Sequence, residues 1–382
     1  MDSLRLTIET DLSRIDARQW DALAGDQPFL RHAFLAALHE TGCAAPETGW
    51  APHYLAFWRD GELAAAAPLY LKSHSRGEYV FDYAWADAFQ RHGMRYYPKL
   101  LSAVPFTPVT GPRLLARNDE DRETLVRGLV AFAEQIKVSS LHLLFPSDAD
   151  MRVLREAGFM IRESVQFHWT NPGYADFEAF LAAMSHDKRK KIRQDRKKVA
   201  AAGLSYCWLR GNEIGPDELG FFYDCYCRTY FSHGNPPYLS REFFERAHRE
   251  QPEAFVLILA QRDGQPVAAA LNLAGGDALY GRYWGATEYV PGLHFETCYM
   301  QSIAYCIAHG IARFEGGAQG EHKMARGLLP TPTWSAHWVG HPGFADAIRT
   351  YLDEETAAVS DYLGELETHT PFKRAADSKD PG

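Results

Sequence analysis

The stretch Arg59–Ala67, RDGELAAAA, returns almost unchanged 203 positions later as Arg262–Ala270, RDGQPVAAA. Each copy follows a run of β-forming residues and places an Asp-Gly pair before a second apolar run. Asp-Gly between two such runs is a strong signal for a β-hairpin, because both turn residues readily adopt positive φ. The repeat therefore predicts two copies of one structural module, each built on a hairpin.

The residues around the hairpins predict the same order of further elements in both halves. Amphipathic helical patterns precede each hairpin, and a third strand, a helix and a further strand follow it. In the first half these elements are expected at 27–42 (helix), 77–89 (strand), 93–103 (helix), 121–137 (a second helix) and 140–146 (strand). In the second half they are expected at 216–234 and 239–250 (helices), 278–290 (strand), 293–309 (helix) and 312–317 (strand).

This order predicts an α/β (α+β) fold of two tandem modules, each a mixed, mostly antiparallel sheet flanked by helices. A chain of 382 residues is also longer than one ordinary core, and two domains are usual at this length. We expect the first module to span 1–167 and the second to span 168–382. The second module would also hold a basic helix at 186–202 and a C-terminal helix.

Composition restricts the class of protein. The N-terminal residues lack the apolar core of a signal peptide, and no stretch reaches the roughly 18 apolar residues that span a bilayer. The six cysteines form no Cys-x-x-Cys pair, so neither a disulfide framework nor a zinc site is indicated. We therefore expect a cytoplasmic protein with no membrane span, no metal site and no permanently bound cofactor.

Positive charge is concentrated in one segment of an acidic chain. The net charge is −9, yet the twelve residues from Asp187 to Lys198 hold eight Lys or Arg against two Asp. Arg189, Arg193 and Arg196 lie at three-and-four spacing and would form one stripe on a helix. The stripe predicts a site for an anionic donor, such as coenzyme A or transfer RNA, or for an anionic membrane surface. A solvated helix face is the alternative. No aromatic residues are interleaved to read bases, so any RNA contact would be to the backbone, and DNA is not expected as a partner.

Three segments resemble one known family. PFTPVTGPRLL (105–115), HDKRKKIRQDRKKV (186–199) and FEGGAQGEHKMARGLLPTPTWSAHW (314–338) are similar to the FemAB-like N-acyltransferases. The order of elements likewise resembles the GNAT acyltransferase module, and Fem-type enzymes resemble two such modules in tandem. The resemblance implies transfer of an activated acyl or aminoacyl group to an amine, which would be an amino acid or a peptidoglycan-precursor-like substrate.

The resemblance also places one lysine in the site and leaves the donor open. Fem-type enzymes carry Gly-Gly at the matching strand end and then a Lys in a basic, glycine-ended stretch, positions held here by Gly316-Gly317 and Lys323. Lys323 is thereby the implied contact to a phosphate or carboxylate of the substrate. The usual GNAT pyrophosphate loop, Gln/Arg-x-x-Gly-x-Gly/Ala, occurs in neither half, so both acyl-coenzyme A and aminoacyl-tRNA stay open as cosubstrate.

Acyl transfer to an amine requires a neutral amine, an oriented acyl group and stabilisation of the oxyanion. Backbone N–H groups between two separating strands can stabilise the oxyanion, so neither a catalytic triad nor a metal motif is needed. His294 and Glu296 open the helix after the third strand of the second half, and Lys323 follows its last strand. We therefore take His294, Glu296 and Lys323 as catalytic candidates. A helix cap for Glu296, a structural role for His294 and a solvated loop at 321–323 are the alternatives.

Further polar and aromatic residues near the predicted strand ends are expected to bind substrate. They are Asp87, Lys99, Thr107, Arg282, Trp284, Tyr299, Glu321 and His322. Lys99 is expected in the helix at 93–103, whereas Thr107 is expected in a loop made rigid by three prolines.

Two functions other than catalysis fit the same sequence. One is a non-catalytic module that binds peptidoglycan or a peptide, and the other is an RNA-binding protein that uses the basic helix. The density of His, Glu and Lys at the predicted strand ends of the second half favours an enzyme, because a pure binder needs no acid-base group near neutrality.

Overall fold

The computed structural model describes residues 4–317 and 320–373 and divides the chain into two compact units. Unit 1 comprises Met1–Ser164 and Pro332–Asp361, and unit 2 comprises Val165–Thr331 and Tyr362–Gly382. The chain leaves unit 1 within strand β9 (Met160–Thr170) and returns to it within strand β15 (Leu329–Val339). The sequence-based division at 167/168 assigned residues 168–382 to the second module. The structure instead groups 332–361 with unit 1, because β15 pairs with a strand of that unit.

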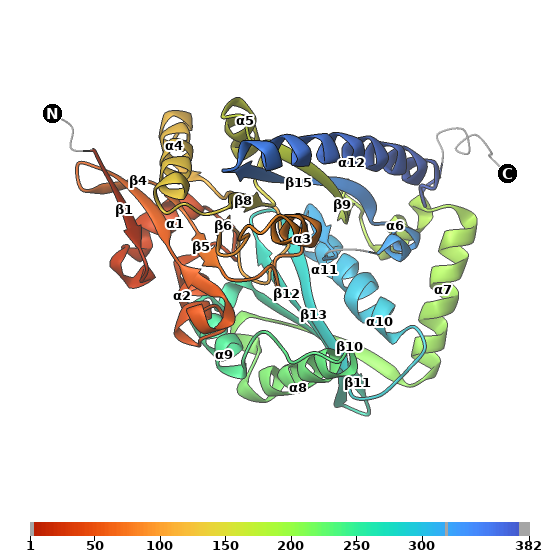
Figure 1. The fold of residues 1–382 in the computed structure, drawn as a ribbon. Helices are drawn as coiled ribbons and strands as arrows, with labels where there is room; N and C mark the ends of the chain where they lie inside the picture. The colour runs from red at the N-terminus through yellow and green to blue at the C-terminus, as the bar shows by residue number, and fades with distance from the viewer. Residues whose placement is uncertain (1–3, 318–319, 374–382) are drawn as a thin grey trace. The chain divides into compact units, whose positions relative to one another are not determined.

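Unit 1 contains two sheets (Figure 1). The first has the antiparallel order β1–β3–β4–β7, and the second has the order β15–β8–β6–β5–β2, in which β6 and β8 are parallel and the other pairs antiparallel. The strands are β1 (Leu4–Glu9), β2 (Trp50–Pro52), β3 (Tyr54–Arg59), β4 (Glu62–Ala67), β5 (Leu69–Lys72), β6 (Lys99–Ser102), β7 (Leu115–Ala116) and β8 (Ser140–Leu144). The helices are α1 (Ala17–Ala24), α2 (His32–Glu40), α3 (Tyr83–Arg91), α4 (Asp119–Gln135), α5 (Asp148–Glu156) and most of α12 (Pro342–Thr368), with 3-10 turns η1 (Leu12–Arg14) and η2 (Pro46–Thr48).

Unit 2 is built on one sheet of order β10–β11–β12–β13–β14–β9, in which β13 and β14 are parallel and the other pairs antiparallel. Its further strands are β10 (Leu204–Arg210), β11 (Phe255–Arg262), β12 (Gln265–Gly275), β13 (Ala278–Ala286) and β14 (Arg313–Glu315). Its helices are α6 (Phe177–Ala183), α7 (His186–Ala201), α8 (Pro216–Ser232), α9 (Arg241–Glu250), α10 (Leu293–Phe295) and α11 (Gln301–His309). Shorter turns are η3 (Gly211–Glu213), η4 (Pro252–Ala254), the π-helical η5 (Glu296–Met300) and η6 (Glu321–Arg326).

The repeated sequence forms the two expected hairpins, β3–β4 and β11–β12. Asp60-Gly61 has φ values of 52° and 86°, and Asp263-Gly264 has 50° and 76°. Positive φ at both central residues is what a type I′ hairpin turn requires. Each hairpin also carries a register shift at the same point, after Phe57 and after Ala260. The two hairpins therefore share their turn conformation and the position of their register shift as well as their sequence. The expected fold class of mixed sheets flanked by helices is confirmed.

Two predictions in the first half are wrong. Residues 77–89 do not form a strand, since Tyr83–Arg91 is helix α3, and 93–103 do not form a helix, since Lys99–Ser102 is strand β6. Trp85 and Phe89 lie one helical turn apart and are both buried. The aromatic residues that suggested a strand thus follow the i, i+4 spacing of a helix.

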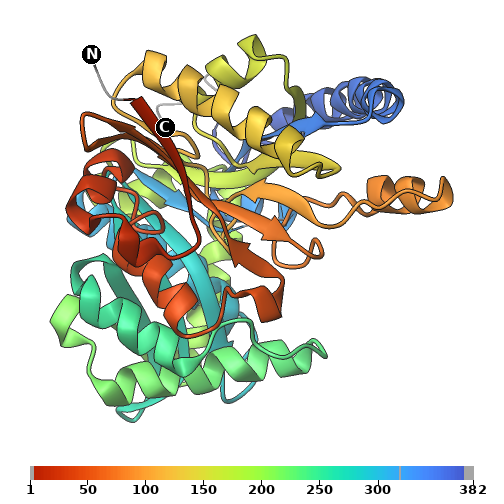
Figure 2. The same cartoon turned by 60° about the vertical axis from the view of Figure 1, so that its left-hand side comes forward.

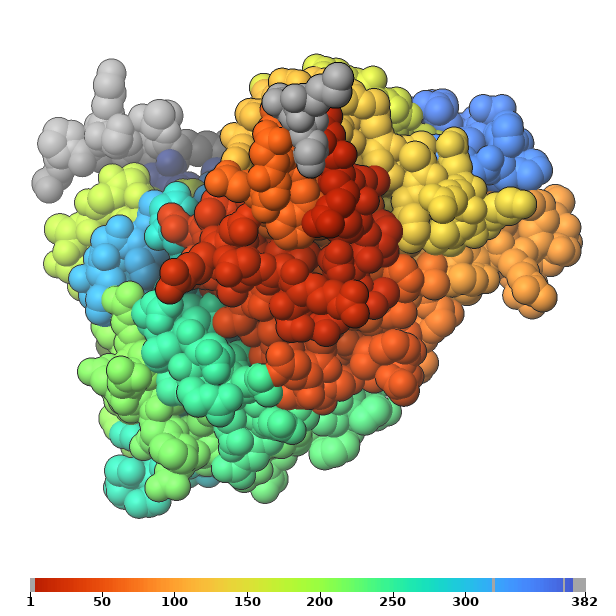
Figure 3. Space-filling view, turned by 90° about the vertical axis from the view of Figure 1, so that its left-hand side faces the viewer, coloured from red at the N-terminus to blue at the C-terminus, as the bar shows by residue number. Residues whose placement is uncertain are grey.

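Strand β6 is the third strand of the first module. It pairs antiparallel with β5 and parallel with β8, as β13 pairs with β12 and β14 in unit 2. Residues 73–98 are therefore an insertion between β5 and β6, at a place where unit 2 has the two-residue turn Gly276-Asp277. Figures 2 and 3 show the insertion (orange) extending outward from the rest of unit 1.

Each unit has its own apolar core. In unit 1 the core lies between the sheets and helices α4 and α5, and includes Leu55, Leu69, Leu100, Leu125, Leu129 and Leu141. In unit 2 it includes Trp169, Phe180, Leu279, Ile303 and Phe314. The core residues of the parallel strand pairs point to one face of each sheet, which leaves the alternate positions of the same strands for polar side chains.

Gly285 on β13 provides a direct test of the packing in unit 2. A Cβ atom at this position would lie 1.9 Å from the backbone carbonyl oxygen of Cys225 in α8. We expect Gly285→Ala to lower the free energy of unfolding by about 3 kcal/mol, because strand and helix backbones must separate. Urea unfolding followed by circular dichroism measures the change.

The matched control is Gly364→Ala in α12, where an added Cβ meets no atom within 4 Å. Alanine should raise stability there by up to about 1 kcal/mol, because glycine costs more conformational entropy in a helix. Equal stability of Gly285→Ala and the native protein would contradict the close approach of α8 to β13.

Candidate functional site

The end of the parallel strand pair in unit 2 creates an opening in the sheet. Strands β13 and β14 pair over three residues, and the last pair joins Tyr280 to Glu315. Beyond it β13 continues to Ala286, whereas the other chain turns away at Gly316-Gly317. Backbone groups of β13 past the last pair therefore have no β14 partner and face the opening.

Five of the predicted residues come together beside this opening. We name Trp284, His294, Tyr299, His322 and Lys323 the strand-end cluster. The ring centroid of His294 lies 5.1 Å from that of Trp284 and 5.6 Å from that of Tyr299, which is 6.2 Å from that of His322. A Cβ atom at Gly316 would meet both Tyr299, at 3.2 Å, and the Lys323 side chain, at 3.6 Å. The cluster thus contains residues from β13, from the helical segment after it and from the loop after β14.

Lys323 is the buried cation of the cluster. Its side chain lies in η6 with a residue exposure of only 2%, and its Nζ donates a hydrogen bond of 2.8 Å to the carbonyl oxygen of Gly317. Burial lowers the pKa of Lys323 to about 8. The ammonium therefore keeps most of its charge at neutral pH and is held at the glycine turn where the strands separate.

His294 supplies a neutral imidazole next to that cation. Burial, together with the positive charges of Arg326 and Lys323 and the neighbouring His322, lowers the pKa of His294 to about 4. Burial likewise raises the pKa of the Tyr299 hydroxyl. At neutral pH the cluster therefore offers one cation, a neutral base and aromatic walls.

Glu296 has a different environment from the other two catalytic candidates. It opens the π-helical turn η5 between α10 and α11, and its Oε1 accepts from Arg196 Nε at 3.1 Å and from Gln301 Nε2 at 2.8 Å. π-helical turns of this kind are frequent at functional sites. The carboxylate lines a cavity of about 470 Å³ together with Arg193, Arg196 and Tyr206. Glu296 is therefore a fixed anion that holds Arg196 at the wall of this cavity.

The predicted basic helix is α7, and its three named arginines make different contacts. Arg189 Nη1 donates to the carbonyl oxygen of Ala182 at 3.4 Å, Arg193 forms an ion pair with Glu178, and Arg196 is held by Glu296. A second hollow of about 340 Å³ runs along α7 between His186 and Lys197. Its walls include Arg189, Lys190, Arg193 and Lys197. The helix thus presents a cationic surface next to the cavity at Glu296.

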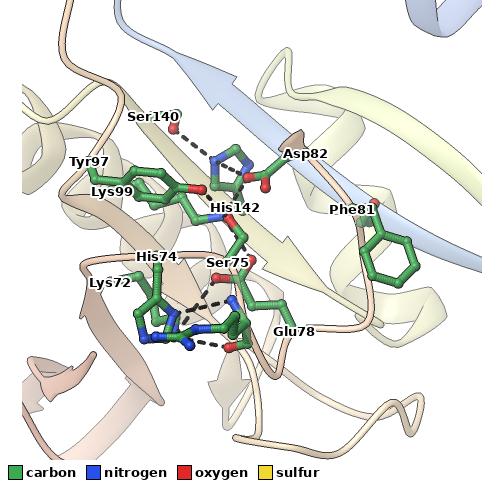
Figure 4. Close-up of polar contacts among 12 residues, drawn as sticks. Lys72, His74, Ser75, Glu78, Phe81, Asp82, Tyr97, Lys99, Ser140 and His142 are labelled. Atoms are coloured by element: carbon green, nitrogen blue, oxygen red, sulfur yellow. Dashed lines mark hydrogen bonds and ion pairs between the residues drawn. The ribbon is translucent and has the colours of Figure 1, made fainter. Parts of the chain in front are cut away.

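Lys99 forms the centre of a separate polar network in unit 1 (Figure 4). Its Nζ donates to Ser75 Oγ at 2.8 Å, to Glu78 Oε2 at 2.7 Å and to Asp82, and its side chain is fully buried. Tyr96 also donates to Asp82 Oδ2, at 2.6 Å. Lys99 lies at the start of β6, while Glu78 and Asp82 belong to the inserted segment. Ion pairs therefore fasten the insertion to the sheet.

The network continues through two histidines of the sheet. His142 Nε2 lies 3.1 Å from the Tyr96 hydroxyl, and His142 Nδ1 lies 2.7 Å from His337 Nδ1. Burial and the charge of Lys99 lower the pKa of His142 to about 3, so the imidazole stays neutral. Burial raises the pKa of Glu78 to about 7. Burial acts in the same direction on Asp82, but the charge and hydrogen bond of Lys99 outweigh it and hold the pKa of Asp82 below its usual value.

Lys72 is a second buried lysine beside this network. Its ammonium lies 3.6 Å from the ring centroid of Trp50 and 4.0 Å from Glu78 Oε1, and burial lowers its pKa to about 7. Glu78 Oε1 and Asp82 Oδ1 are buried atoms without a hydrogen bond in the described part of the chain. Lys72 and Lys99 are 27 positions apart in the sequence, and Glu78 and Asp82 lie between them. Spacing alone did not single out Lys72 or Glu78.

The other predicted substrate contacts lie outside the strand-end cluster. Asp87 is exposed on α3 and pairs with Arg91 at 2.9 Å, and Thr107 is buried and donates to the carbonyl oxygen of Pro105 at 3.0 Å. Arg282 lies on β13 over the Tyr283 ring, with its guanidinium carbon 5.3 Å from the ring centroid. Exposed Glu321 accepts a hydrogen bond of 2.6 Å from Tyr362.

Four further buried titratable residues, which face one another in two pairs across neighbouring strands, were not predicted from the sequence. His142 on β8 faces His337 on β15, and Glu315 on β14 faces His168 on β9. The alternation of polar and apolar residues in SLHLL (140–144) and RFE (313–315) was a usable signal. In a buried strand, a polar residue at an alternate position marks a place where the sheet face is not purely apolar.

The strand orders and the repeated hairpins define a protein of two tandem α/β modules. The chain belongs to the FemAB-like family, because the family model described as peptidoglycan biosynthesis/recognition matches residues 11–374.

Solved structures share the fold at low sequence identity. FemX has a TM-score of 0.55 at 13% identity, with 88% of this chain and 98% of that chain covered. The L-PGS from Bacillus licheniformis has a TM-score of 0.55 at 10% identity, with 88% and 96% covered. The C-terminal domain of a putative lysylphosphatidylglycerol synthetase from Agrobacterium fabrum has 0.52 at 10% identity, with 89% and 97% covered. At such identities the likeness establishes the fold alone.

Curated protein sequences contain no match to this chain. Over residues 4–317 and 320–373, no group of three or more His, Cys, Asp or Glu side chains is arranged to hold a metal ion. In the same residues no helix has the length and apolar character needed to cross a membrane.

Proposed function

We propose that this protein transfers an activated acyl or aminoacyl group to an amine acceptor, with the chemistry in unit 2 at the strand-end cluster. The observation that carries the proposal is Lys323, a buried cation fixed at the glycine turn where β13 and β14 separate. A cation held beside an opening lined by backbone groups is suited to stabilise the oxyanion of acyl transfer.

The other members of the cluster receive roles that follow from their surroundings. His294 stays neutral at physiological pH and can relay a proton, while Trp284, Tyr299 and His322 form the walls that orient the acyl group. Arg282, on β13 next to the opening, is assigned to the acceptor side. Exposed Glu321 is assigned to the solvent-facing edge of the strand-end cluster.

The basic side of α7 is assigned to the donor. Arg189, Arg193 and Arg196 line the two neighbouring hollows, and Glu296 fixes Arg196 in place. A phosphate-bearing donor, either acyl-coenzyme A or aminoacyl-tRNA, matches this charge. The family description, peptidoglycan biosynthesis/recognition, supports a peptide-like or peptidoglycan-precursor acceptor. We give Lys99 and Thr107 structural roles, because both side chains are buried and bonded within the chain.

The donor is tested by the thermal stability of the purified protein. A ligand that binds only the folded state raises the unfolding midpoint as its concentration exceeds its Kd. We expect a rise with either acetyl- or longer acyl-coenzyme A esters, or with charged transfer RNA. The double variant Arg189→Glu/Arg193→Glu should reduce the rise, and added salt should weaken binding to the native protein more than to the variant.

The control is Arg249→Glu on α9, an exposed arginine outside both hollows, which should leave the rise intact. An identical rise in the double variant and the native protein would show that α7 does not bind the donor. No rise with any donor would contradict the proposed function.

A non-catalytic peptidoglycan- or peptide-binding protein is the second candidate, since the family description also names recognition. This function predicts that a peptidoglycan fragment raises the unfolding midpoint and that no acyl group is transferred from any donor. An RNA-binding protein predicts equal rises with charged and uncharged transfer RNA and no effect of Lys323 variants.

A further inference from the structure

Glu315 and His142 occupy matching positions in the two units. Each lies on the strand that runs parallel to the third strand of its module, β14 beside β13 and β8 beside β6. Each also faces a histidine on the antiparallel strand at its other side, so that Glu315 is opposite His168 and His142 is opposite His337. The two pairs allow the same place in the fold to be compared within one molecule.

In unit 1 the matching position is closed by the chain itself. Both ring nitrogens of His142 have partners, His337 Nδ1 at 2.7 Å on one side and Ser140 Oγ at 2.8 Å on the other. The insertion covers this face of the sheet with the ion pairs of Lys99. No proton-accepting atom of His142 is therefore left for a substrate.

In unit 2 the same position holds a carboxylate with an unused oxygen. Glu315 has only 4% of its surface exposed, and its Oε1 accepts from Arg313 Nε at 3.1 Å. Its Oε2 is a buried atom without a hydrogen bond to any described residue, and it lies 3.8 Å from His168 Nε2. A buried acceptor atom without a donor costs free energy, which indicates that a donor is supplied from outside the chain.

Glu315 also lies at the right point of the sheet. It forms the last parallel pair before the strands separate, and it directly precedes the glycine turn that holds Lys323. Glu315 therefore lies beside the strand separation, two residues before the carbonyl group that holds Lys323.

The charges around Glu315 set its affinity for a proton. Burial raises its pKa to about 7, against the lowering effect of Arg313 and Arg282, and Asp277 adds a small increase. His168, on the facing strand, stays neutral because burial lowers its pKa to about 3. The carboxylate is thus poised to take up and release a proton near neutral pH.

We propose that Glu315 is the proton acceptor for the amine substrate, and that unit 2 alone carries this function. The inference rests on the proposed function. Glu315 removes one proton from the acceptor ammonium, which frees the nitrogen lone pair. The nitrogen then bonds to the acyl carbon, the bond from that carbon to the donor oxygen or sulfur breaks, and the leaving group takes the second amine proton. Glu315 afterwards releases its proton to solvent.

The test compares Glu315→Gln with the native protein in two measurements. Carboxyl-¹³C NMR of glutamate-labelled protein should show two glutamates that titrate near pH 7, one lost in Glu315→Gln and the other in Glu78→Gln. The transfer rate, measured with the donor that raises the unfolding midpoint, should fall by about 10²- to 10³-fold at pH 7 in Glu315→Gln. The native rate should fall as pH drops through about 7, and this acid limb should be absent from the variant.

The control is Glu253→Gln, an exposed glutamate that should keep the native rate and pH profile. If native protein transfers the acyl group and Glu315→Gln keeps both rate and acid limb, Glu315 is not the base and the proposed function stands. If Glu315 titrates below about pH 5, the proposal is likewise overturned. If native protein transfers from no donor, the proposed function fails, and the role of Glu315 fails with it.

Discussion

Replacing Lys323 with methionine is expected to lower the rate of acyl transfer by about 10²- to 10³-fold at pH 7 while the protein stays folded. Methionine has a similar length and is apolar, so it fills the same buried space without the charge. The loss is expected because the ammonium at Gly317 would no longer stabilise the developing oxyanion. Single-turnover transfer from the bound donor measures the change.

The design separates charge from fold. Lys373→Met replaces an exposed lysine of the same unit and should leave the rate unchanged. Circular dichroism and the unfolding midpoint of Lys323→Met should match those of the native protein, because removing a buried charge from apolar surroundings offsets the loss of the hydrogen bond to Gly317. A native rate in a folded Lys323→Met protein would remove Lys323 from the site.

Replacing Lys99 with methionine is expected to lower the free energy of unfolding by about 3–5 kcal/mol. The variant leaves Glu78 and Asp82 buried without their cation, and the insertion loses its attachment to β6. Breaking a buried ion pair from one side costs more than the pair contributes, since the remaining charges have no solvent to replace the partner. Urea unfolding with tryptophan fluorescence measures the change.

Two further variants make the Lys99 result specific. Arg91→Ala removes the exposed ion pair with Asp87 on the same insertion, and should change stability by less than about 0.5 kcal/mol. The triple variant Lys99→Met/Glu78→Gln/Asp82→Asn removes all three charges and should recover part of the loss. A change below about 1 kcal/mol in Lys99→Met alone would contradict the stabilising role of the network.

The repeat was readable from sequence because its signal is local. Two Asp-Gly turns with positive φ and matching alanine-rich strands are fixed by neighbouring residues, so the hairpins and most helices could be predicted. The residues of the strand-end cluster were also predicted, since they flank a strand end and a glycine turn. Their proximity across α10, η5 and η6 became visible only in the folded unit.

The wrong prediction at 77–103 has a physical cause. Aromatic residues in this segment satisfy both a strand pattern and the i, i+4 spacing of a helix, and propensity does not choose between them. The helix at 83–91 and the strand at 99–102 are favoured by tertiary contacts. Trp85 and Phe89 are buried in unit 1, and Lys99 can be buried only because carboxylates pair with its charge. Contacts distant in sequence therefore decided the local structure.

The sequence by itself determined the tandem modules, their hairpins, the basic helix and the loop that carries Lys323. The tertiary structure alone decided that Lys99 is a structural cation, that Glu296 holds an arginine, and that Glu315 lies at the last strand pair with an unused oxygen. The reason is physical: hairpins and helices depend on short-range torsional and hydrogen-bond preferences. The charge state and role of a buried group depend on which side chains from distant strands exclude water around it.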